Sequence, residues 1–362
     1  MSEKSDKVYI ELQESLDKLP VSYPATESGV EIRILKRLFS PEKALVASKL
    51  TEIPRPIEDF YKELEKEGIP LDRAEKTLDE MHEEGLIIRI IPKDVKLYVL
   101  SPFVLGFYEY QMNKMTEGLI HDVDEYFQEY LRANNKVNLP QLRTIPIEQS
   151  VGIENNIATY DEVRALIDNS GEPIVVNECI CRKKNGIIGK PCKKTDLKWA
   201  CLSFRSHGMA FIDKGLGKII TKEEAYEIIE KAQQDGLVVQ CGNSQRPPSL
   251  CFCCGCCCNL IYNQKKFEAP AQYFDTNYYA QVDSESCSGC GTCETRCQMD
   301  AIEMVDDKPI IDLGSCIGCG LCTPTCPDEA ITLIKKEKVK IPPKDTKEMY
   351  MTLAKNKQQL DM

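Results

Sequence analysis

The sequence CSGCGTCETRC at residues 287–297 recurs in outline as CIGCGLCTPTCP at residues 316–327. Each run contains the pattern C-x2-C-x2-C-x3-C, and a shift of 29 residues lays the four cysteines of the first run on those of the second. The same shift carries Ala301-Ile302 onto Ala330-Ile331, an apolar pair that follows each run. The repeat therefore predicts two pseudo-symmetric halves in which cysteine thiolates surround metal centres.

The spacing resembles that of bacterial ferredoxins with two [4Fe–4S] clusters, in which the fourth cysteine of each run binds the cluster of the other run. Zinc ribbons and disulfides are the alternatives, but zinc sites rarely need eight cysteines in two interlocked runs. In one departure from the usual pattern, Gln298 follows Cys297, whereas Pro327 follows Cys326. The resemblance implies two ligand sets, Cys287, Cys290, Cys293 and Cys326 for cluster 1 and Cys316, Cys319, Cys322 and Cys297 for cluster 2.

The composition of the chain favours a metalloprotein without disulfides. Its 362 residues, 42% of them hydrophobic, allow two or three domains. The start, MSEKSDKVYI, contains no apolar signal region, and the chain has no run of about eighteen apolar residues, so we expect a cytoplasmic protein without a membrane span. In that compartment 19 cysteines indicate metal binding, and with only three histidines most ligands must be thiolates.

The periodicity of residues 25–105 predicts a winged-helix-like domain, in which helices precede a β-hairpin. The expected helices span residues 27–39, 40–50, 56–67 and 71–84, and the hairpin strands span residues 86–91 and 95–100.

The expected helix at 71–84 would be the one that enters a DNA groove in such a domain. Its carboxylates outnumber Arg73 and Lys76, and the formal net charge of the whole chain is −11. Because DNA phosphates repel carboxylates, we expect this domain to act as a scaffold or to contact protein, and we expect no DNA partner.

A long amphipathic helix is expected from Gly106 to Asn134, because aromatic residues recur through this stretch. Its aromatic side should pack on the domain before it or on a subunit partner, while Asp122 and Glu125 are expected on the solvated side. Residues 138–152 contain Pro140 and Pro146 and read as a linker.

The middle of the chain holds a second concentration of cysteine. Strands are expected at 174–176 and 237–239, and a capping box of Thr221 and Glu224 predicts a helix between them. In an extended chain alternate side chains face opposite ways, so cysteines of the CFCCGCCC run at 251–258 should divide between two faces. One or two further iron–sulfur clusters, or zinc, are therefore expected on a subset of Cys179, Cys181, Cys192, Cys201, Cys251, Cys253, Cys254, Cys256, Cys257 and Cys258.

The whole order of segments resembles multidomain ferredoxin-like proteins of anaerobic bacteria and archaea. The resemblance implies an α+β fold with a winged-helix-like domain and long helix at 1–135, a small α+β cysteine-rich domain at 136–280, a two-cluster ferredoxin domain at 281–336 and a tail at 337–362. It also implies electron transfer with redox partner proteins, as a carrier or as a subunit of an oxidoreductase complex.

Two other functions stay open at this stage. A redox-responsive transcription regulator would use the winged helix, and a thiol–disulfide oxidoreductase would act at the central cysteines. We favour an electron carrier or oxidoreductase subunit over a stand-alone enzyme, because two close cubane clusters pass electrons without binding a substrate. The sequence shows no glycine-rich nucleotide loop, so it gives no support for flavin, NAD or ATP binding.

Overall fold

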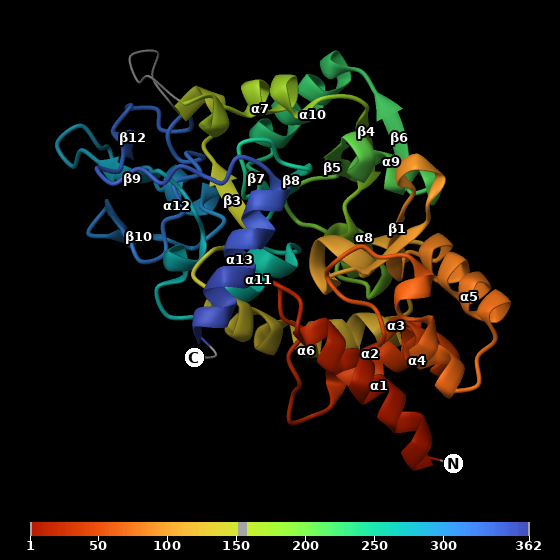
Figure 1. Cartoon of the computed structure of the whole chain (residues 1–362). Helices are drawn as coiled ribbons and strands as arrows, with labels where there is room; N and C mark the ends of the chain where they lie inside the picture. The colour runs from red at the N-terminus through yellow and green to blue at the C-terminus, as the bar shows by residue number, and fades with distance from the viewer. Residues whose placement is uncertain (1, 151–157, 361–362) are drawn as a thin grey trace. The chain divides into compact units, whose positions relative to one another are not determined.

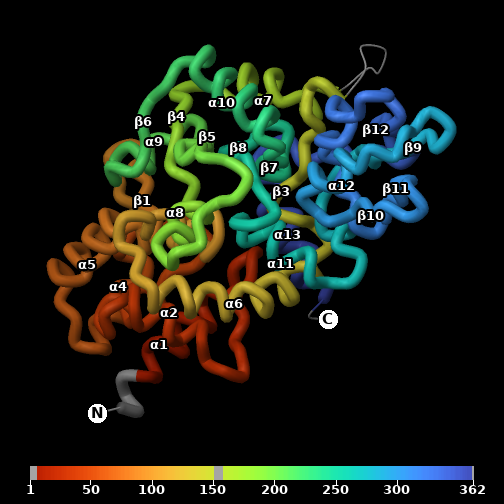
Figure 2. Tube along the Cα trace, turned by 180° about the vertical axis from the view of Figure 1, so that it is seen from behind, coloured from red at the N-terminus to blue at the C-terminus, as the bar shows by residue number. Residues whose placement is uncertain are grey.

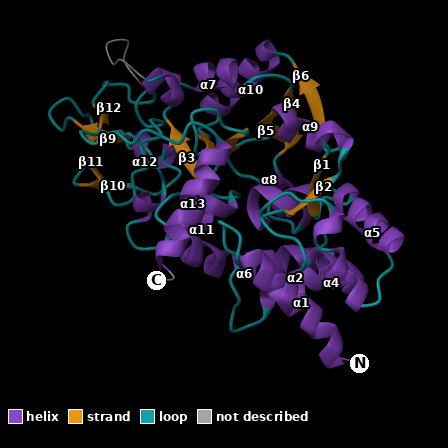
Figure 3. Cartoon of the chain, viewed as in Figure 1, coloured by secondary structure: helices purple, strands orange, loops and turns teal. Residues whose placement is uncertain are grey.

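The computed structural model of the protein describes residues 2–150 and 158–360 and divides into two compact units. The first unit comprises residues 1–137 and 353–362, and the second comprises residues 138–352. Figure 3 shows a mixed helical and sheet protein, in which the first unit is largely helical and most strands belong to the second.

The first unit consists of helices and one β-hairpin. The predicted helices before residue 85 and the hairpin that follows them are confirmed, although the third helix is short and the chain also begins with a helix that we did not predict. The elements are α1 (Ser2–Asp17), α2 (Val30–Leu38), α3 (Pro41–Ala47), α4 (Tyr61–Lys66), α5 (Leu71–Glu83), β1 (Ile87–Ile90), β2 (Leu97–Leu100) and α6 (Glu117–Asn135).

The long helix α6 begins eleven residues later than the sequence predicted. The hydroxyl of Thr116 caps it by accepting a hydrogen bond from the Leu119 amide at 3.2 Å. Residues 103–111 form short irregular turns instead, and Leu105 in this stretch has a positive φ of 57°. The aromatic residues expected on this helix are buried nevertheless, and ring pairs such as Tyr23–Tyr126 pack with centroids 4.9 Å apart.

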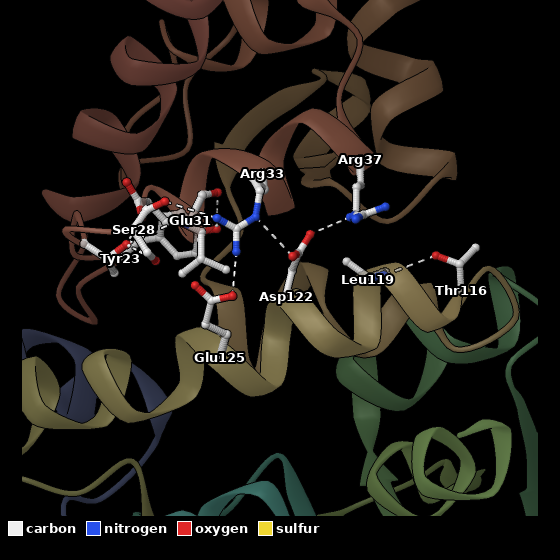
Figure 4. A network of polar contacts seen from close by, with 11 residues as sticks. Tyr23, Ser28, Glu31, Arg33, Arg37, Thr116, Leu119, Asp122 and Glu125 are labelled. Carbon is white, nitrogen blue, oxygen red and sulfur yellow. Dashed lines mark hydrogen bonds and ion pairs between the residues drawn. The ribbon is translucent and has the colours of Figure 1, made fainter. Parts of the chain in front are cut away.

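Asp122 lies on the packed side of α6, contrary to the prediction that it would be solvated. It is 7% exposed and forms ion pairs with Arg33 at 3.2 Å and Arg37 at 2.5 Å, both on α2. Figure 4 shows Arg33 between Asp122 and Glu125, with Arg37 on the other side of Asp122. Two cations therefore offset the desolvation of this carboxylate, which fixes α6 against α2.

The second unit is organised around a six-stranded antiparallel sheet with the order β3-β7-β8-β5-β4-β6. The capping box of Thr221 and Glu224 is confirmed at the start of α10, which contacts α7 as well as β4 and β5 (Figure 1). The elements are β3 (Leu142–Ile145), α7 (Val163–Ser170), β4 (Ile174–Glu178), α8 (Ile180–Ile187), β5 (Trp199–Phe204), α9 (Arg205–Asp213), β6 (Gly217–Ile220), α10 (Lys222–Gln234), β7 (Val238–Gly242), β8 (Ser249–Cys253) and α11 (Asn259–Gln264).

The chain then forms two small antiparallel pairs, β9 with β12 and β10 with β11. Their elements are β9 (Tyr278–Val282), α12 (Thr292–Arg296), β10 (Ile302–Val305), β11 (Lys308–Ile311) and β12 (Ile331–Lys335). Helix α13 (Thr346–Leu360) follows and crosses from the second unit into the first along the chain. Figure 2 shows these small strand pairs gathered at one end of the second unit.

The large sheet shares its apolar core with the loops of the C-terminal cysteine runs, whereas the small strand pairs have a second core around Ala280, Ile302 and Ile331. Ile317 and Leu321, which lie between the cysteines of the second run, are each 1% exposed and pack in the same cluster as Ile145 and Phe252 of the sheet. The backbone amide of Ile147 also donates a hydrogen bond to the Cys319 carbonyl at 3.0 Å. The C-terminal cysteine runs are therefore held by the same packing that holds the central sheet.

Candidate metal centres

The 29-residue repeat is visible in the backbone around the C-terminal cysteines. Gly289 and Gly318, which correspond under that shift, both have positive φ, at 79° and 61°. A Cβ on Gly318 would collide with the Tyr278 carbonyl oxygen, so this position requires glycine. The residues Asp300 and Glu329 also correspond, and their φ values of 55° and 51° show the same turn after each run.

Backbone amides point at the sulfur atoms in both halves. The Ala301 amide donates to Cys297 Sγ, and the equivalent Ala330 amide donates to Cys326 Sγ, both at 3.3 Å. The Gly289 amide donates to Cys287 Sγ at 3.4 Å. Because such bonds favour the thiolate and tune a bound cluster, these residues fit the iron–sulfur groups that the cysteine spacing implies.

The fourth cysteine of the first run lies close to cysteines of the second run. Burial raises the pKa of Cys319 well above its usual value, and the thiols Cys297, Cys322 and Cys316 raise it further. Burial also raises the pKa of Cys293, with smaller contributions from Cys290 and Cys287. Cys297 therefore lies among the cysteines of the other run.

The two groups differ in their access to solvent. Cys290 is exposed, whereas Cys293 and Cys322 are buried. Cys297, Cys316 and Cys319 pack against the core of the central sheet, so this group lies deeper in the unit.

Six of the central cysteines form a closed ring, which we call the six-cysteine ring. Cys201 on β5 lies opposite Cys251 on β8, and Cys253 follows two residues along the same face of β8. Cys179 and Cys258 are the N-cap residues of α8 and α11. Neighbouring thiols of the ring shift one another's pKa values in the order Cys179, Cys181, Cys258, Cys253, Cys251, Cys201 and back to Cys179.

The thiols of the six-cysteine ring are close enough to change one another's pKa values. Hydrogen bonds from Cys201 and Cys253 lower the pKa of Cys251 to about 5. The pKa values of Cys179 and Cys258 are lowered in the same way, and those of the three intervening thiols are raised. The backbone amides of Arg182 and Ile261 also donate to the two N-cap sulfurs, so several sulfurs of the ring favour the thiolate form that metals bind.

The other four central cysteines, Cys192, Cys254, Cys256 and Cys257, form a separate group that we call the cysteine quartet. Their ligand atoms all lie within 4.8 Å of one another. Cys256 Sγ lies 3.6 Å from both Cys254 Sγ and Cys257 Sγ, and 3.8 Å from Cys192 Sγ. The alternation predicted for the 251–258 run therefore separates Cys251 and Cys253 from Cys254 and Cys256, as expected.

Arg182 is buried between the ring and the quartet. It is 8% exposed and donates hydrogen bonds to the carbonyls of Leu197 and Phe252. Burial alone would lower its pKa, but the neighbouring thiolates, Cys179 and Cys254 first among them, outweigh burial and raise it. This guanidinium therefore offsets negative charge on both groups.

A cavity of about 760 Å³ opens beside the two groups. Cys179 of the ring and Cys192 of the quartet both line it, and most of its charged side chains are basic. The basic residues are Arg182, Lys183, Lys193, Lys194 and Lys198, against the acidic Glu178 and Asp196.

Gln298 connects the quartet to the C-terminal cysteines. Its side-chain oxygen accepts a hydrogen bond from the Gly255 amide at 2.8 Å, and Gln298 is 3% exposed. A Cβ on Gly255 would collide with the Gln298 carbonyl oxygen, which requires glycine there. The sequence showed Gln298 as a departure from proline, but nothing in the sequence indicated that its partner would be Gly255.

The remaining cysteine and the histidines belong to none of these groups. Cys241 is fully buried in β7, and burial raises its pKa to about 12. His82 accepts a hydrogen bond from the Arg89 amide, and His207 packs edge-on against Phe211. Within the described residues, the group of metal-ligating side chains that lie mutually close is the cysteine quartet, and it contains no histidine.

Comparison with known proteins supports the assignment of the C-terminal runs. Residues 286–333 match the 4Fe-4S dicluster domain family. No curated protein matches the chain. Among the described residues, no helix has both the length and the apolar character needed to cross a membrane. The C-terminal part of the second unit is therefore a ferredoxin-type 4Fe-4S domain, and together with the cysteine quartet it points to iron–sulfur electron transfer.

Proposed function

We propose that the protein transfers electrons as a carrier or as a subunit of an oxidoreductase, through two [4Fe–4S] clusters. The observation that carries this proposal is the pair of equivalent amide–sulfur hydrogen bonds in the two cysteine runs. The clusters would supply one-electron chemistry at low potential. The ligand sets are Cys287, Cys290, Cys293 and Cys326 for cluster 1, and Cys316, Cys319, Cys322 and Cys297 for cluster 2.

The solvent exposure of the ligands supports a path for electrons from a partner protein through the two clusters. Cys290 is the exposed ligand, so a redox partner protein would dock near it. Cys297 and Cys319 pack against the core that also contains Cys253 and Cys258 of the six-cysteine ring, so cluster 2 would exchange electrons with a further metal site at that ring. An exposed cluster ligand is sensitive to oxidation, which suits the cytoplasm of an anaerobic cell.

The N-terminal unit would serve as a winged-helix-like scaffold or protein-contact domain. The order of α2 to α5 followed by the β1–β2 hairpin supports the comparison. Asp79 on α5 forms ion pairs with Arg89 and Lys96 of the hairpin, and Arg73 forms an ion pair with Glu42. These pairs leave few basic groups on the helix that would meet DNA phosphates.

Anaerobic quantification of iron, sulfide and zinc, with EPR of the dithionite-reduced protein, tests this function. Two clusters require about eight irons and eight sulfides per chain, and more iron would indicate a further cluster in the central domain. Replacing the buried ligand by Cys293→Ser should remove about four irons and change the reduced EPR signal. Cys241→Ala, a buried cysteine outside all groups, is the matched control and should lose no iron. Colourless oxygen-free protein without inorganic sulfide would reject the proposal.

The basic cavity beside Cys179 favours a second candidate function, a thiol–disulfide oxidoreductase at the central cysteines. Such an enzyme would use two electrons from the ferredoxin domain and two protons to reduce an anionic disulfide to two thiols. Oxidised glutathione is a suitable probe because it is an anionic disulfide. The reduced protein should convert it to glutathione, and Cys179→Ser should abolish this without changing the eight irons of the C-terminal runs. Equal rates for the variant and the parent would reject this candidate.

A further inference from the structure

The cysteine quartet has the arrangement of a single tetrahedral metal site. Three pairs of Sγ atoms lie 3.6 Å apart: Cys192 with Cys254, Cys254 with Cys256, and Cys256 with Cys257. Cys192 Sγ and Cys256 Sγ lie 3.8 Å apart, and all four sulfurs lie within 4.8 Å of one another, as the corners of a small tetrahedron would.

The size of this tetrahedron distinguishes one ion from a cluster. Zinc–sulfur bonds of about 2.3 Å in tetrahedral geometry place the sulfurs about 3.8 Å apart, which agrees with the distances in the quartet. A [4Fe–4S] cube puts iron and sulfide between its four thiolates, so these must lie farther apart. The same chain provides the comparison: among the described residues, no three of the eight C-terminal cysteine sulfurs lie within 4.8 Å of one another.

We propose that Cys192, Cys254, Cys256 and Cys257 bind one divalent metal ion in tetrahedral thiolate coordination, separately from the six-cysteine ring. Zinc is the expected ion, because it binds four thiolates and exceeds iron in affinity for a given site. The inference refines the further metal site named under the proposed function, by removing four of the ten central cysteines from any cluster there.

The surroundings of the quartet suit a metal–thiolate centre with a net negative charge. The amides of Lys194 and Thr195 donate to Cys192 Sγ, which holds this sulfur in a tight turn. The Lys265 ammonium lies beside Gly255, and Arg182 lies close enough to Cys254 for its charge to be felt. Both cations lower the cost of gathering four thiolates.

The ion would join two segments that are distant along the chain. Cys192 belongs to the loop between α8 and β5, and the other three ligands belong to the turn after β8 that contacts Gln298. A bound ion would therefore fix the loop that borders the basic cavity to the turn that contacts the ferredoxin domain. Its expected role is structural, since zinc does not change oxidation state.

Metal analysis of the anaerobically purified full-length protein tests the inference. The parent protein should contain one zinc, or one iron unaccompanied by sulfide, beyond the metal of its clusters. Cys256→Ser should lose that one equivalent and retain the iron, the sulfide and the reduced EPR signals, whereas Cys241→Ala should retain everything. Loss of about four irons and four sulfides in Cys256→Ser would overturn the inference in favour of a cluster. An unchanged metal content would overturn it in favour of free thiols.

Replacing the metal by cobalt in the parent protein tests the site without a variant, so the result does not depend on whether a variant folds. Cobalt in the quartet should give the strong visible d–d bands and sulfur-to-metal charge transfer of tetrahedral thiolate coordination. Their absence in protein that has taken up one cobalt would contradict the tetrahedral site. The proposed function fails separately: protein with one zinc but no sulfide would reject electron transfer and leave this inference standing.

Discussion

The hydrogen bond of Gln298 explains why the first cysteine run is followed by glutamine, whereas the second is followed by proline. The residue equivalent to Pro327 is a glutamine because its side-chain oxygen accepts the buried Gly255 amide, which proline could not do. The sequence allowed the ligands of the runs to be predicted from spacing, since that spacing is local. It could not identify the partner of Gln298, because the contact joins residues 43 positions apart.

Replacing Gln298 by leucine should loosen the turn at residues 254–257. The Gly255 amide would remain buried without an acceptor, which costs about 1–3 kcal/mol. Hydrogen exchange measured on peptides covering residues 251–258 should become about five- to hundredfold faster. Gln272→Leu, at a position outside this contact, should leave exchange at these peptides unchanged. Equal protection in both variants would show that the hydrogen bond does not hold the turn.

Asp122 should contribute more to the stability of the first unit than the other carboxylates of α6. In Asp122→Asn, Arg33 and Arg37 lose a nearly buried charge partner, and we expect a loss of about 1–2 kcal/mol. Thermal unfolding followed by circular dichroism at neutral pH measures the effect. Glu125→Gln removes a more exposed partner of Arg33 and should change stability by less than about 0.5 kcal/mol. A larger loss in the second variant would contradict this ranking.

Helices and strands whose formation depends on neighbouring residues were predicted correctly from the sequence. The capping box at Thr221 and the strands at 174–176 and 237–239 are present because their side-chain patterns act within a few residues. The linker expected at 138–152 is partly wrong: β3 lies within it and pairs with β7, while residues 151–152 lie outside the described part of the chain. This strand is set by a partner almost a hundred residues away, so proline content alone was misleading.

The hairpin between β10 and β11 offers a stabilising change. Its two turn residues, Asp306 and Asp307, have positive φ values of 49° and 58°, as a type I′ turn requires. Replacing this pair by Asn-Gly should stabilise the ferredoxin domain by about 0.5–1 kcal/mol, because glycine adopts positive φ without strain. The half-life of the visible absorbance on anaerobic heating should lengthen. Asp306→Val should shorten it, and the opposite order would contradict the turn assignment.

The surface of α5 predicts that the protein does not bind DNA tightly. Arg73 is paired with Glu42, and Lys76 lies 4.0 Å from Glu80, so the basic groups of this helix already have acidic neighbours. A mobility-shift assay of the anaerobic protein at low salt should show no sequence-dependent complex. A tight and sequence-dependent shift would favour the transcription-regulator hypothesis.

On the scale of the whole molecule, the second unit joins segments that differ in composition. Met299, Ile317 and Leu321 of the ferredoxin domain share a core with the central sheet. Such packing leaves no periodic pattern in the sequence, because each contributing residue stands alone among cysteines and glycines. The cysteine ring and quartet follow from the same long-range packing, so the sequence identified their members but not their division.

The negative charge of the molecule predicts how its reduction rate changes with ionic strength. The formal net charge is −11, and residues 281–336 contain ten Asp and Glu against four Lys and Arg. Reduction by a cationic viologen radical should therefore slow as ionic strength rises, because salt screens the attraction. Stopped-flow rates with the anionic dithionite radical should rise under the same conditions. Equal salt dependence for both reductants would show that the entry face is not acidic.

The positive charge of Arg182 acts on both groups of central cysteines. One guanidinium serves as counter-ion for thiolates of two neighbouring centres, and it is held by carbonyl groups that prevent it from moving toward either. Negative charge added at one centre is therefore compensated by a cation that the other centre also needs. The energetic cost of reducing or loading one group of sulfurs consequently depends on the charge state of the other.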